Sequence, residues 1–224
     1  MYNISKLRKA EILFLANNKC SHRHTYLSHL PCAEKEGVSF IQNKILLFDL
    51  ETEPHQGYYW GKDWDTSIIK STEYGKILSF AAKWLNGKTY VRGIVDYGNK
   101  EELLVKELWK LFNEADTLVA HNGRQFDVRW ANSRFIKYGL PAPSLYKVID
   151  TKTLAKKYLY LPDYSLSTIA DYYGLGRKTE HEGFGLWLKC MEGDKKAWRR
   201  MKKYNLNDVI LLEKVYLKLK TLCS

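Results

Sequence analysis

The segment from Lys44 to Leu50 constrains the fold of this chain more than any other part of the sequence. The residues from Ile45 to Phe48 are all apolar, so an extended strand here carries apolar side chains on both of its faces. Such a strand must be covered on both sides, which places it at the centre of a sheet between layers of helices. The segment therefore predicts an α/β domain built around one buried strand.

Further segments predict the rest of this domain, which we expect to cover residues 43–224. Strand-like runs at 77–85 and 89–97 flank Asn86-Gly87, a dipeptide that favours a type I′ hairpin and hence an antiparallel pair. Shorter strands are expected at 117–120 and 148–149. The expected helices cover 101–114, 126–138, 151–159, 165–173 and 194–220. This order predicts a mixed β-sheet flanked by helices.

Residues 1–42 are expected to form a small N-terminal part, with a helix over 3–17 followed by a Cys/His-rich segment. Four potential ligands in that segment have spacings that structural Zn²⁺ tolerates: Cys20, His24, His29 and Cys32. His22 could replace His24 in this set. The alternative interpretation is a polar loop that binds no metal, and the sequence leaves both open.

The charge of the chain is strongly unbalanced. Lysine and arginine number 36 against 25 aspartate and glutamate residues, which gives a formal net charge of +11. Such a chain is attracted to polyanions, among which nucleic acid and anionic membrane surfaces are the usual candidates. The sequence contains neither a basic amphipathic helix with a Trp/Leu face nor an apolar run near the ~18 residues that span a bilayer. Nucleic acid is therefore the favoured partner.

Four acidic residues occupy positions where a purely structural role is awkward. Asp49 and Glu51 lie two residues apart at the end of the central strand, so their side chains leave the same face. Asp127 begins a helix after a short strand, and Asp208 lies in an apolar stripe of the last helix, four residues after Tyr204. Each position also has a structural alternative. Asp49 and Glu51 fit a strand that ends in solvent, and Asp127 fits a first-turn acid favoured by the helix dipole. Asp208 fits a core aspartate paired with a cation.

One explanation accounts for all four acids together. Two unit charges about 4 Å apart repel by about 4 kcal/mol at an effective dielectric of about 20, so four converging carboxylates need counter-charge. Two divalent cations would supply it, and oxygen-only ligation selects Mg²⁺ or Mn²⁺ over Zn²⁺. Two such ions about 4 Å apart activate water and stabilise the leaving oxygen of a phosphodiester. The acids therefore predict metal-dependent hydrolysis of nucleic acid.

Three short motifs contain these residues, in the order Asp49-x-Glu51, His121-Asn122-x-x-x-Phe126-Asp127 and Tyr204-x-x-x-Asp208. In this order they resemble the motifs of the DEDD 3′→5′ exonuclease superfamily, which has a ribonuclease H-like fold. The tyrosine is typical of the tyrosine (DEDDy) branch, because the histidine branch has His five residues before the last Asp, where this chain has Lys203. The chain is also similar to small stand-alone exonucleases encoded by bacteriophages.

The resemblance implies a role for each of these side chains. Asp49 would bridge two metal ions, and Glu51 and Asp208 would complete the site that carries the nucleophilic water. Asp127 would hold the second ion. Tyr204 would orient the water, because a phenol with a pKa of about 10 is a poor base at neutral pH.

Contacts to nucleic acid are expected from further residues. Asn122 and Phe126 would line a pocket for the terminal nucleotide, although Phe126 also fits a core position. Trp60 could stack on an unpaired base or pack over the sheet as part of a hairpin. Three basic residues of the last helix would contact phosphates or form a solvated face: Arg199, Arg200 and Lys203.

The function predicted by these features is that of a metal-dependent 3′→5′ exonuclease that releases 5′-mononucleotides, with DNA favoured over RNA. The alternatives are a structure-selective ribonuclease H-like endonuclease and a catalytically inactive nucleic-acid-binding module of the same fold. The resemblance further implies a polymerase or another replication or repair protein as a partner. The lack of a secretory signal pattern and of a dense cysteine framework favours the cytoplasm of a bacterial or phage-infected cell.

Overall fold

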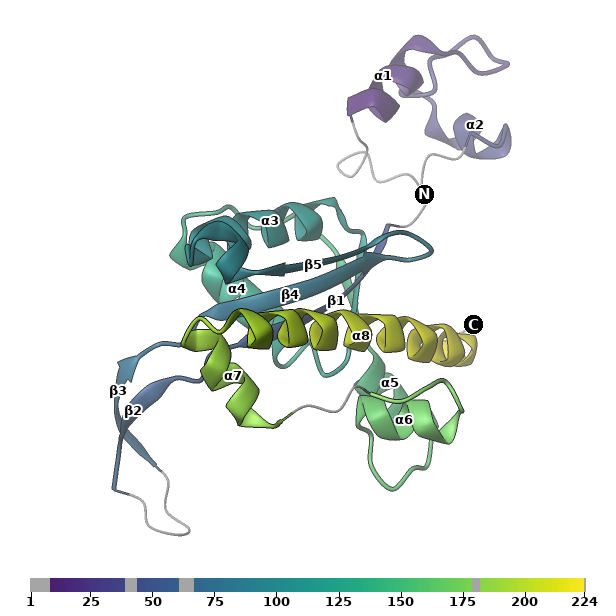
Figure 1. The fold of residues 1–224 in the computed structure, drawn as a ribbon. Helices are drawn as coiled ribbons and strands as arrows, with labels where there is room; N and C mark the ends of the chain where they lie inside the picture. The colour runs from purple at the N-terminus through teal and green to yellow at the C-terminus, as the bar shows by residue number, and fades with distance from the viewer. Residues whose placement is uncertain (1–8, 39–43, 61–66, 179–181, 224) are drawn as a thin grey trace. The chain divides into compact units, whose positions relative to one another are not determined.

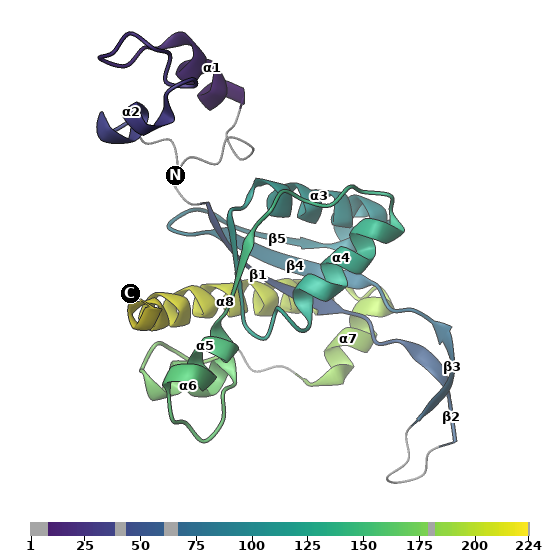
Figure 2. The same cartoon turned by 180° about the vertical axis from the view of Figure 1, so that it is seen from behind.

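The computed structural model describes residues 9–38, 44–60, 67–178 and 182–223. The chain divides into two compact units, Met1–Lys44 and Ile45–Ser224, and each is described by itself. Figures 1 and 2 show the elements of both units from opposite sides. None of the helices within the described ranges is long and apolar enough to cross a bilayer.

The N-terminal unit contains two short helices, α1 (Lys9–Asn17) and α2 (Leu30–Lys35). The expected helix over 3–17 is confirmed from residue 9 onward, and its first residues lie outside the described part. Helix α2 was not expected, although a proline in its first turn is a common helix-start signal. The two fully buried apolar side chains described in this unit are Leu15 and Ala33.

The main unit is organised around a five-stranded mixed sheet, as expected. Its strands are β1 (Ile45–Thr52), β4 (Ile77–Trp84), β5 (Thr89–Gly93), β6 (Thr117–Ala120) and β7 (Lys147–Asp150). Their order across the sheet is β5-β4-β1-β6-β7, so the apolar run forms the central strand. Strand β1 pairs antiparallel with β4 and parallel with β6, while β5 and β7 complete the two edges.

Six α-helices of the described residues cover this sheet and its ends. They are α3 (Glu101–Glu114), α4 (Asp127–Lys137), α5 (Thr151–Tyr158), α6 (Leu166–Tyr172), α7 (Phe184–Met191) and α8 (Lys195–Leu219). All except α7 agree with the sequence-based expectation to within a few residues. Helix α7 was not expected, because it begins directly after Gly183, which has a positive φ of 64°, and contains Gly185, a residue that disfavours helix interiors.

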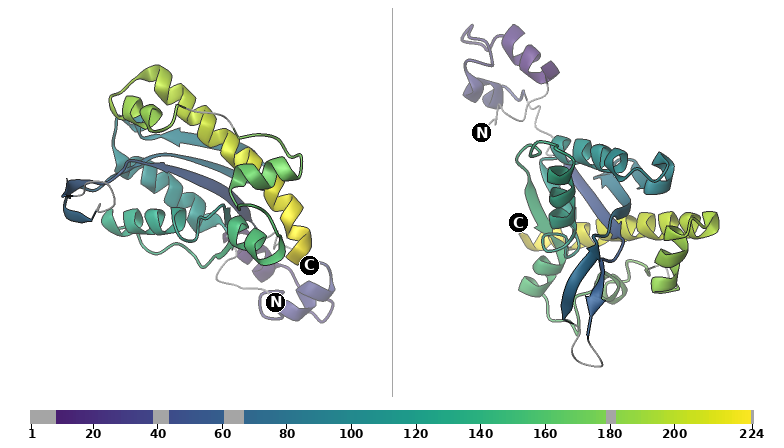
Figure 3. Two further views of the ribbon diagram at one scale, coloured as in Figure 1. Left: turned by 90° about the horizontal axis from the view of Figure 1, so that it is seen from below. Right: turned by 90° about the vertical axis from the view of Figure 1, so that its left-hand side faces the viewer.

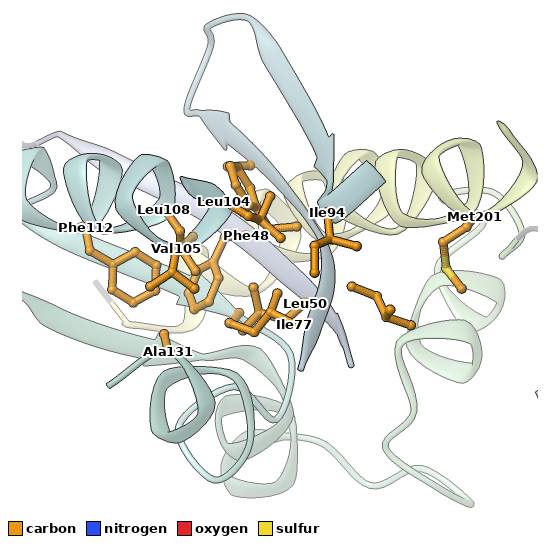
Figure 4. Close-up of a cluster of buried hydrophobic side chains, with 14 of the residues drawn as sticks. Phe48, Leu50, Ile77, Ile94, Leu104, Val105, Leu108, Phe112, Ala131 and Met201 are labelled. Atoms are coloured by element: carbon orange, nitrogen blue, oxygen red, sulfur yellow. The ribbon is translucent and has the colours of Figure 1, made fainter. Parts of the chain in front are cut away.

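The two faces of β1 pack against different helices. Leu46 and Phe48 belong to a buried cluster with side chains of α3 and α4, part of which is drawn in Figure 4. Leu47, on the opposite face, belongs to a cluster with side chains of α5, α6 and α8. Figure 3 shows the sheet lying between these two helical layers. Because side chains alternate along a strand, Asp49 and Glu51 leave β1 on the side of Leu47 and therefore point toward α8.

The turn between β4 and β5 differs in detail from the expected type I′ hairpin. The antiparallel pair is confirmed, but the turn is closed by a hydrogen bond from the Gly87 backbone N–H to the Trp84 carbonyl at 2.7 Å. Its central residues are thus Leu85 and Asn86, and of these only Asn86 has a positive φ, of 60°. The Asn-Gly pair therefore marks the turn correctly but lies one residue later in it than expected.

A second, two-stranded sheet extends from the end of β1 (Figure 1). It pairs β2 (Gln56–Tyr59) with β3 (Ile68–Glu73) in antiparallel fashion. Its base is anchored to helix α4: the Gly75 N–H donates to His55 Nδ1 at 3.0 Å, and His55 stacks on Trp130 of α4 with ring centroids 5.2 Å apart. A Cβ atom at Gly75 would lie 2.2 Å from the Glu53 carbonyl oxygen, so only glycine fits there.

Candidate active site

Three carboxylates from distant parts of the sequence meet at the end of the central strand. Asp49 and Glu51 come from β1, and Asp208 comes from the middle of α8. Their side chains offer oxygen atoms that all lie within 4.8 Å of one another. Glu51 and Asp208 are buried and Asp49 is half-buried, so solvent screens their charges poorly.

Asp127 lies beside this group, as the first residue of α4. It is buried, and its Oδ1 accepts a hydrogen bond at 3.0 Å from the backbone N–H of Leu50, the residue between Asp49 and Glu51. Asp127 is also close enough for its charge to raise the pKa of Asp49. The structure thus places all four expected acids around one end of β1, three of them as a tight group and Asp127 next to it.

Burial and mutual repulsion make these carboxyl groups hard to ionise. Loss of solvent is the main cause that raises the pKa of Asp49 well above its usual range, and the charges of Glu51, Asp127 and Asp208 add to it. Burial, with repulsion from Asp208, raises the pKa of Glu51 to about 8. Burial likewise raises the pKa of Asp127 to about 7. The group therefore calls for added positive charge at neutral pH.

Lys178 is a cation of this site that the sequence reasoning did not identify. Its Nζ lies 2.9 Å from Asp208 Oδ2 and 4.9 Å from the centre of the Tyr204 ring. Burial is the largest single influence and acts to lower the pKa of Lys178, but the charge of Asp208 together with hydrogen bonds to Tyr204 and Asp208 raises that pKa overall. Lys178 follows α6 in a segment without periodic apolar residues, so no sequence pattern connects it to the acids.

Tyr204 is buried one helical turn before Asp208 on α8, as the spacing predicted. Its ring packs edge-to-face against Trp187 of α7, with ring centroids 6.0 Å apart. Burial and the nearby charge of Asp208 raise the pKa of the Tyr204 hydroxyl, so the phenol stays protonated at neutral pH. The Trp187 side chain also hydrogen-bonds to Glu51, which connects the unexpected helix α7 to the carboxylates.

Asn205 is the second residue of this site that the sequence reasoning missed. Its Nδ2 donates to Asp49 Oδ2 at 2.7 Å and reaches the Asp49 carbonyl oxygen at 3.3 Å. Its Oδ1 accepts a hydrogen bond from Ser79 Oγ of β4 at 3.0 Å. Asn205 and Ser79 are fully buried. A polar residue directly after Tyr204, on the sheet-facing side of the helix, was the available signal.

The second motif plays a mainly structural part at its start. His121 Nε2 lies 3.0 Å from the Tyr164 carbonyl oxygen, and its Nδ1 lies 2.9 Å from Thr151 Oγ1. Burial lowers the pKa of His121 to about 4, so the imidazole is neutral at pH 7. Asn122 has a left-handed backbone with φ of 62°, and its N–H donates to Asp150 at 3.0 Å. Asp150 in turn caps the first turn of α5.

Phe126 lies on the surface immediately before Asp127. Its side chain is 42% exposed, which excludes the alternative core position. It lines a cavity of about 380 Å³ together with His55, Tyr74, Arg129 and Trp130. The cavity combines aromatic rings with a guanidinium group, a lining suited to a nucleobase and its phosphate.

The remaining expected contacts to nucleic acid are exposed. Trp60 follows β2 with 88% of its surface exposed, so it does not pack over the sheet. Arg199 and Lys203 lie on the exposed side of α8. Arg200 lies four residues before Tyr204. Its Nη1 atom forms an ion pair with Glu182 Oε1 at 2.7 Å.

The Cys/His cluster of the N-terminal unit comes together around His22 rather than His24. Ligand atoms of Cys20, His22, His29 and Cys32 all lie within 4.8 Å of one another. The His24 side chain lies outside the group: its ring packs edge-to-face against the His29 ring with centroids 5.2 Å apart, and its carbonyl oxygen accepts a hydrogen bond from the Cys20 N–H at 2.9 Å. Of the two expected ligand sets, the structure therefore brings together the one with His22.

Comparisons with known proteins agree with this geometry. No curated protein sequence matches the chain. Among solved structures, the family B DNA polymerase from the hyperthermophilic archaeon Pyrobaculum calidifontis is similar, with a TM-score of 0.60 and 16% identity over 80% of this chain and 25% of the polymerase. At this low sequence identity, the structural similarity shows a shared fold and does not by itself show a shared function. A model of the RNase_H superfamily matches residues 46–220, a range that contains all three motifs. This protein therefore belongs to the RNase_H superfamily.

Proposed function

We propose that this protein is a metal-dependent 3′→5′ exonuclease of the DEDD type, tyrosine branch, that removes 5′-mononucleotides from a nucleic-acid strand, preferably DNA. One observation carries the proposal: three acids from β1 and α8 meet with oxygen atoms within 4.8 Å, with Asp127 beside them. Buried carboxylates in such a group are costly unless cations neutralise them.

The donor set fits two Mg²⁺ or Mn²⁺ ions. All four side chains offer only oxygen, which these hard cations prefer, and the raised pKa values of Asp49, Glu51 and Asp127 are typical of a site that lacks its counter-charge. Asp49, Glu51 and Asp208 would hold one ion, and Asp49 with Asp127 would hold the other. Bound ions lower the pKa of water and neutralise charge on the phosphodiester.

The chain itself supplies the groups that position the water. The Tyr204 hydroxyl stays protonated, so it acts as a hydrogen-bonding group that orients the water and not as a base. Lys178 places a positive charge beside Asp208 at 2.9 Å and limits the repulsion among the acids. Asn205 holds the carboxylate of Asp49 at 2.7 Å, so this side chain is already oriented before a metal binds.

The side chains around the acids are suited to bind a nucleic-acid strand whose end lies at this site. Phe126, which lines the cavity of about 380 Å³, directly precedes Asp127 in the sequence, and Asn122 belongs to the same loop. Trp60 offers an exposed ring for stacking on an unpaired base. Arg199 and Lys203 add exposed positive charge on the helix that contains Tyr204 and Asp208.

The test is digestion of 5′-labelled single-stranded DNA by the purified protein with Mg²⁺ or Mn²⁺. We expect a ladder that shortens one nucleotide at a time, no cleavage of a covalently closed circular strand, and no reaction with EDTA. Asp49→Asn should lose at least about three orders of magnitude in rate, because it removes the bridging carboxylate. Glu102→Gln, an exposed change on α3, is the matched control and should retain the wild-type rate.

Each alternative function has its own outcome in this experiment. Cleavage of the circular strand would identify an endonuclease. Binding of the oligonucleotide without cleavage under all metal conditions would identify a binding module. A parallel series with RNA of the same sequence decides whether DNA is the preferred substrate, and a 3′-labelled strand should release its label as a mononucleotide.

A further inference from the structure

The Cys/His group of the N-terminal unit is a metal site that the nuclease reaction does not require. Cys20 follows α1, His22 lies in the next turn, His29 precedes α2, and Cys32 lies in the first turn of that helix. We infer that Cys20, His22, His29 and Cys32 bind one structural Zn²⁺ ion, which holds the N-terminal unit folded.

The distances fit a single tetrahedral ion. Zn–S bonds of about 2.3 Å and Zn–N bonds of about 2.0 Å give ligand-to-ligand distances of about 3.3–3.8 Å. The four ligand atoms lie within 4.8 Å of one another, and Cys32 Sγ is 3.2 Å from both His22 Nδ1 and His29 Nδ1. In a cluster with two iron atoms, two of the ligands would bind each metal and the two pairs would lie farther apart. Four ligand atoms this close together therefore favour a single ion.

The chemistry of the ligands selects zinc over the cations of the main site. Two thiolates and two imidazoles are soft or borderline donors, whereas Mg²⁺ and Mn²⁺ prefer oxygen. Four protein ligands also complete the tetrahedron, so no position remains for a catalytic water. The site is therefore structural.

The protein holds this ligand arrangement in place. Cys20 and Cys32 are only 4% and 5% exposed, and both are free of disulfide bonds. The loop between them is fixed by Glu36, whose Oε1 accepts hydrogen bonds from the backbone N–H and the hydroxyl of Ser21, at 2.9 and 2.7 Å. Glu36 Oε2 accepts a further bond from the Tyr26 hydroxyl at 2.7 Å. Such support around ligands is typical of built metal sites.

The small core explains why the unit needs an ion. Its described residues include only two fully buried apolar side chains, Leu15 and Ala33, against which a few partly buried residues pack. Units of about 40 residues seldom gain enough stability from hydrophobic burial alone and commonly depend on disulfides or metals. With free thiols at its centre, this unit gains its stability from zinc coordination, which couples metal binding to folding.

His24 supplies a matched control for the experiment. It lies two residues after His22 in the same loop and is exposed like His22, but its ring nitrogens do not belong to the ligand group. The zinc content of the purified full-length protein is measured by elemental analysis and by native mass spectrometry. We expect about one Zn²⁺ per chain in the wild type and in His24→Ala, and loss of zinc in Cys20→Ser and His22→Ala.

Two further measurements test the zinc assignment on the wild-type protein, so they depend neither on whether the variants fold nor on nuclease activity. Replacement by Co²⁺ in the wild-type protein should give the visible bands of a tetrahedral thiolate site. Limited proteolysis after chelation should cut within residues 9–38 and leave the main unit intact. A wild-type protein without zinc after growth in zinc-supplied medium, a Cys20–Cys32 disulfide, or zinc loss in His24→Ala equal to that in His22→Ala would overturn the assignment.

Discussion

Asn205 Nδ2 donates a hydrogen bond to Asp49 Oδ2 at 2.7 Å, and this contact ties helix α8 to the acidic end of the central strand. Asn205 is fully buried, and its Oδ1 accepts a hydrogen bond from the hydroxyl of Ser79 on β4 at 3.0 Å. The contact orients the one carboxylate that the proposed mechanism shares between both ions. Asn205 is thus a positioning residue for Asp49.

Replacement of Asn205 by alanine should therefore weaken metal use as well as stability. We expect Asn205→Ala to lower the free energy of unfolding by about 1–3 kcal/mol, because it leaves the Ser79 hydroxyl unpaired in the interior. The rate should fall by about 10- to 100-fold, with a higher Mg²⁺ requirement. Ser79→Ala is the control, since it keeps the bond to Asp49. An equal rise in Mg²⁺ requirement in that control would show that packing, not orientation of Asp49, is responsible.

Removal of the Tyr204 hydroxyl should slow cleavage and leave metal binding nearly unchanged. In Tyr204→Phe the ring still packs against Trp187 and below Lys178, so the local structure is retained. We expect the single-turnover rate to fall by about 10- to 100-fold, with the Mg²⁺ midpoint within about twofold of wild type. Tyr216→Phe, a buried change farther along α8, is the control. Strongly weakened Mg²⁺ binding in Tyr204→Phe would contradict the positioning role.

Lys178 should compete with the metal for Asp208 in the absence of substrate. Lys178→Gln removes the cation 2.9 Å from Asp208, so the carboxylate group becomes more negative and Mg²⁺ binding should tighten by about 3- to 10-fold. Isothermal titration calorimetry with Mg²⁺ measures this change. The neighbouring Arg177, 90% exposed as a side chain, provides the matched control Arg177→Gln, which should change the affinity little. Unaltered or weaker Mg²⁺ affinity in Lys178→Gln would rule out the competition.

His121 should make the stability of the protein fall with acidity. Its pKa is about 4 in the folded protein against 6.5 for the free side chain, so unfolding takes up a proton between these pH values. Its contribution is complete above pH 6.5 and is lost as the pH falls toward 4, with a slope of at most about 1.4 kcal/mol per pH unit. The raised pKa values of the buried acids act in the opposite direction, so the His121 contribution is read as the difference between two proteins: in urea unfolding from pH 7 to 4, the stability of the wild type relative to His121→Gln should fall with this slope. Parallel curves for the two proteins would disprove the assignment.

The sequence predicted the fold well because its main signals are local. The apolar run before Asp49 identified the central strand, and the spacing of Tyr204 and Asp208 placed both on one face of α8. The acids could be grouped because each lies on a recognisable element: the central strand, the first turn of a helix, or the apolar stripe of the last helix. Helix α2 was missed because its six residues form fewer than two turns, and α7 was missed because Gly183 and Gly185 at its start favour a loop.

The site residues that the sequence did not predict were missed for a different reason. Lys178 reaches Asp208 from an irregular segment, and its role depends on tertiary contacts that no local spacing records. Asn205 was passed over because asparagine within a helix is common and its partners, Asp49 and Ser79, lie on two other elements. His22 and His24 offered equivalent spacings, and only the turn after Cys20, closed by the Arg23 N–H on the Cys20 carbonyl at 2.8 Å, distinguishes them.

The fixed base of the β2–β3 hairpin has a consequence for how this enzyme fold can vary. Gly75 and the stack of His55 on Trp130 join the hairpin to α4, the helix that begins with Asp127. The four acids lie on β1, α4 and α8, and none of them on β2 or β3. The arm that includes Tyr58 and Trp60 can therefore be lengthened, shortened or exchanged, by evolution or by an engineer, to suit a different substrate while the reaction chemistry stays intact.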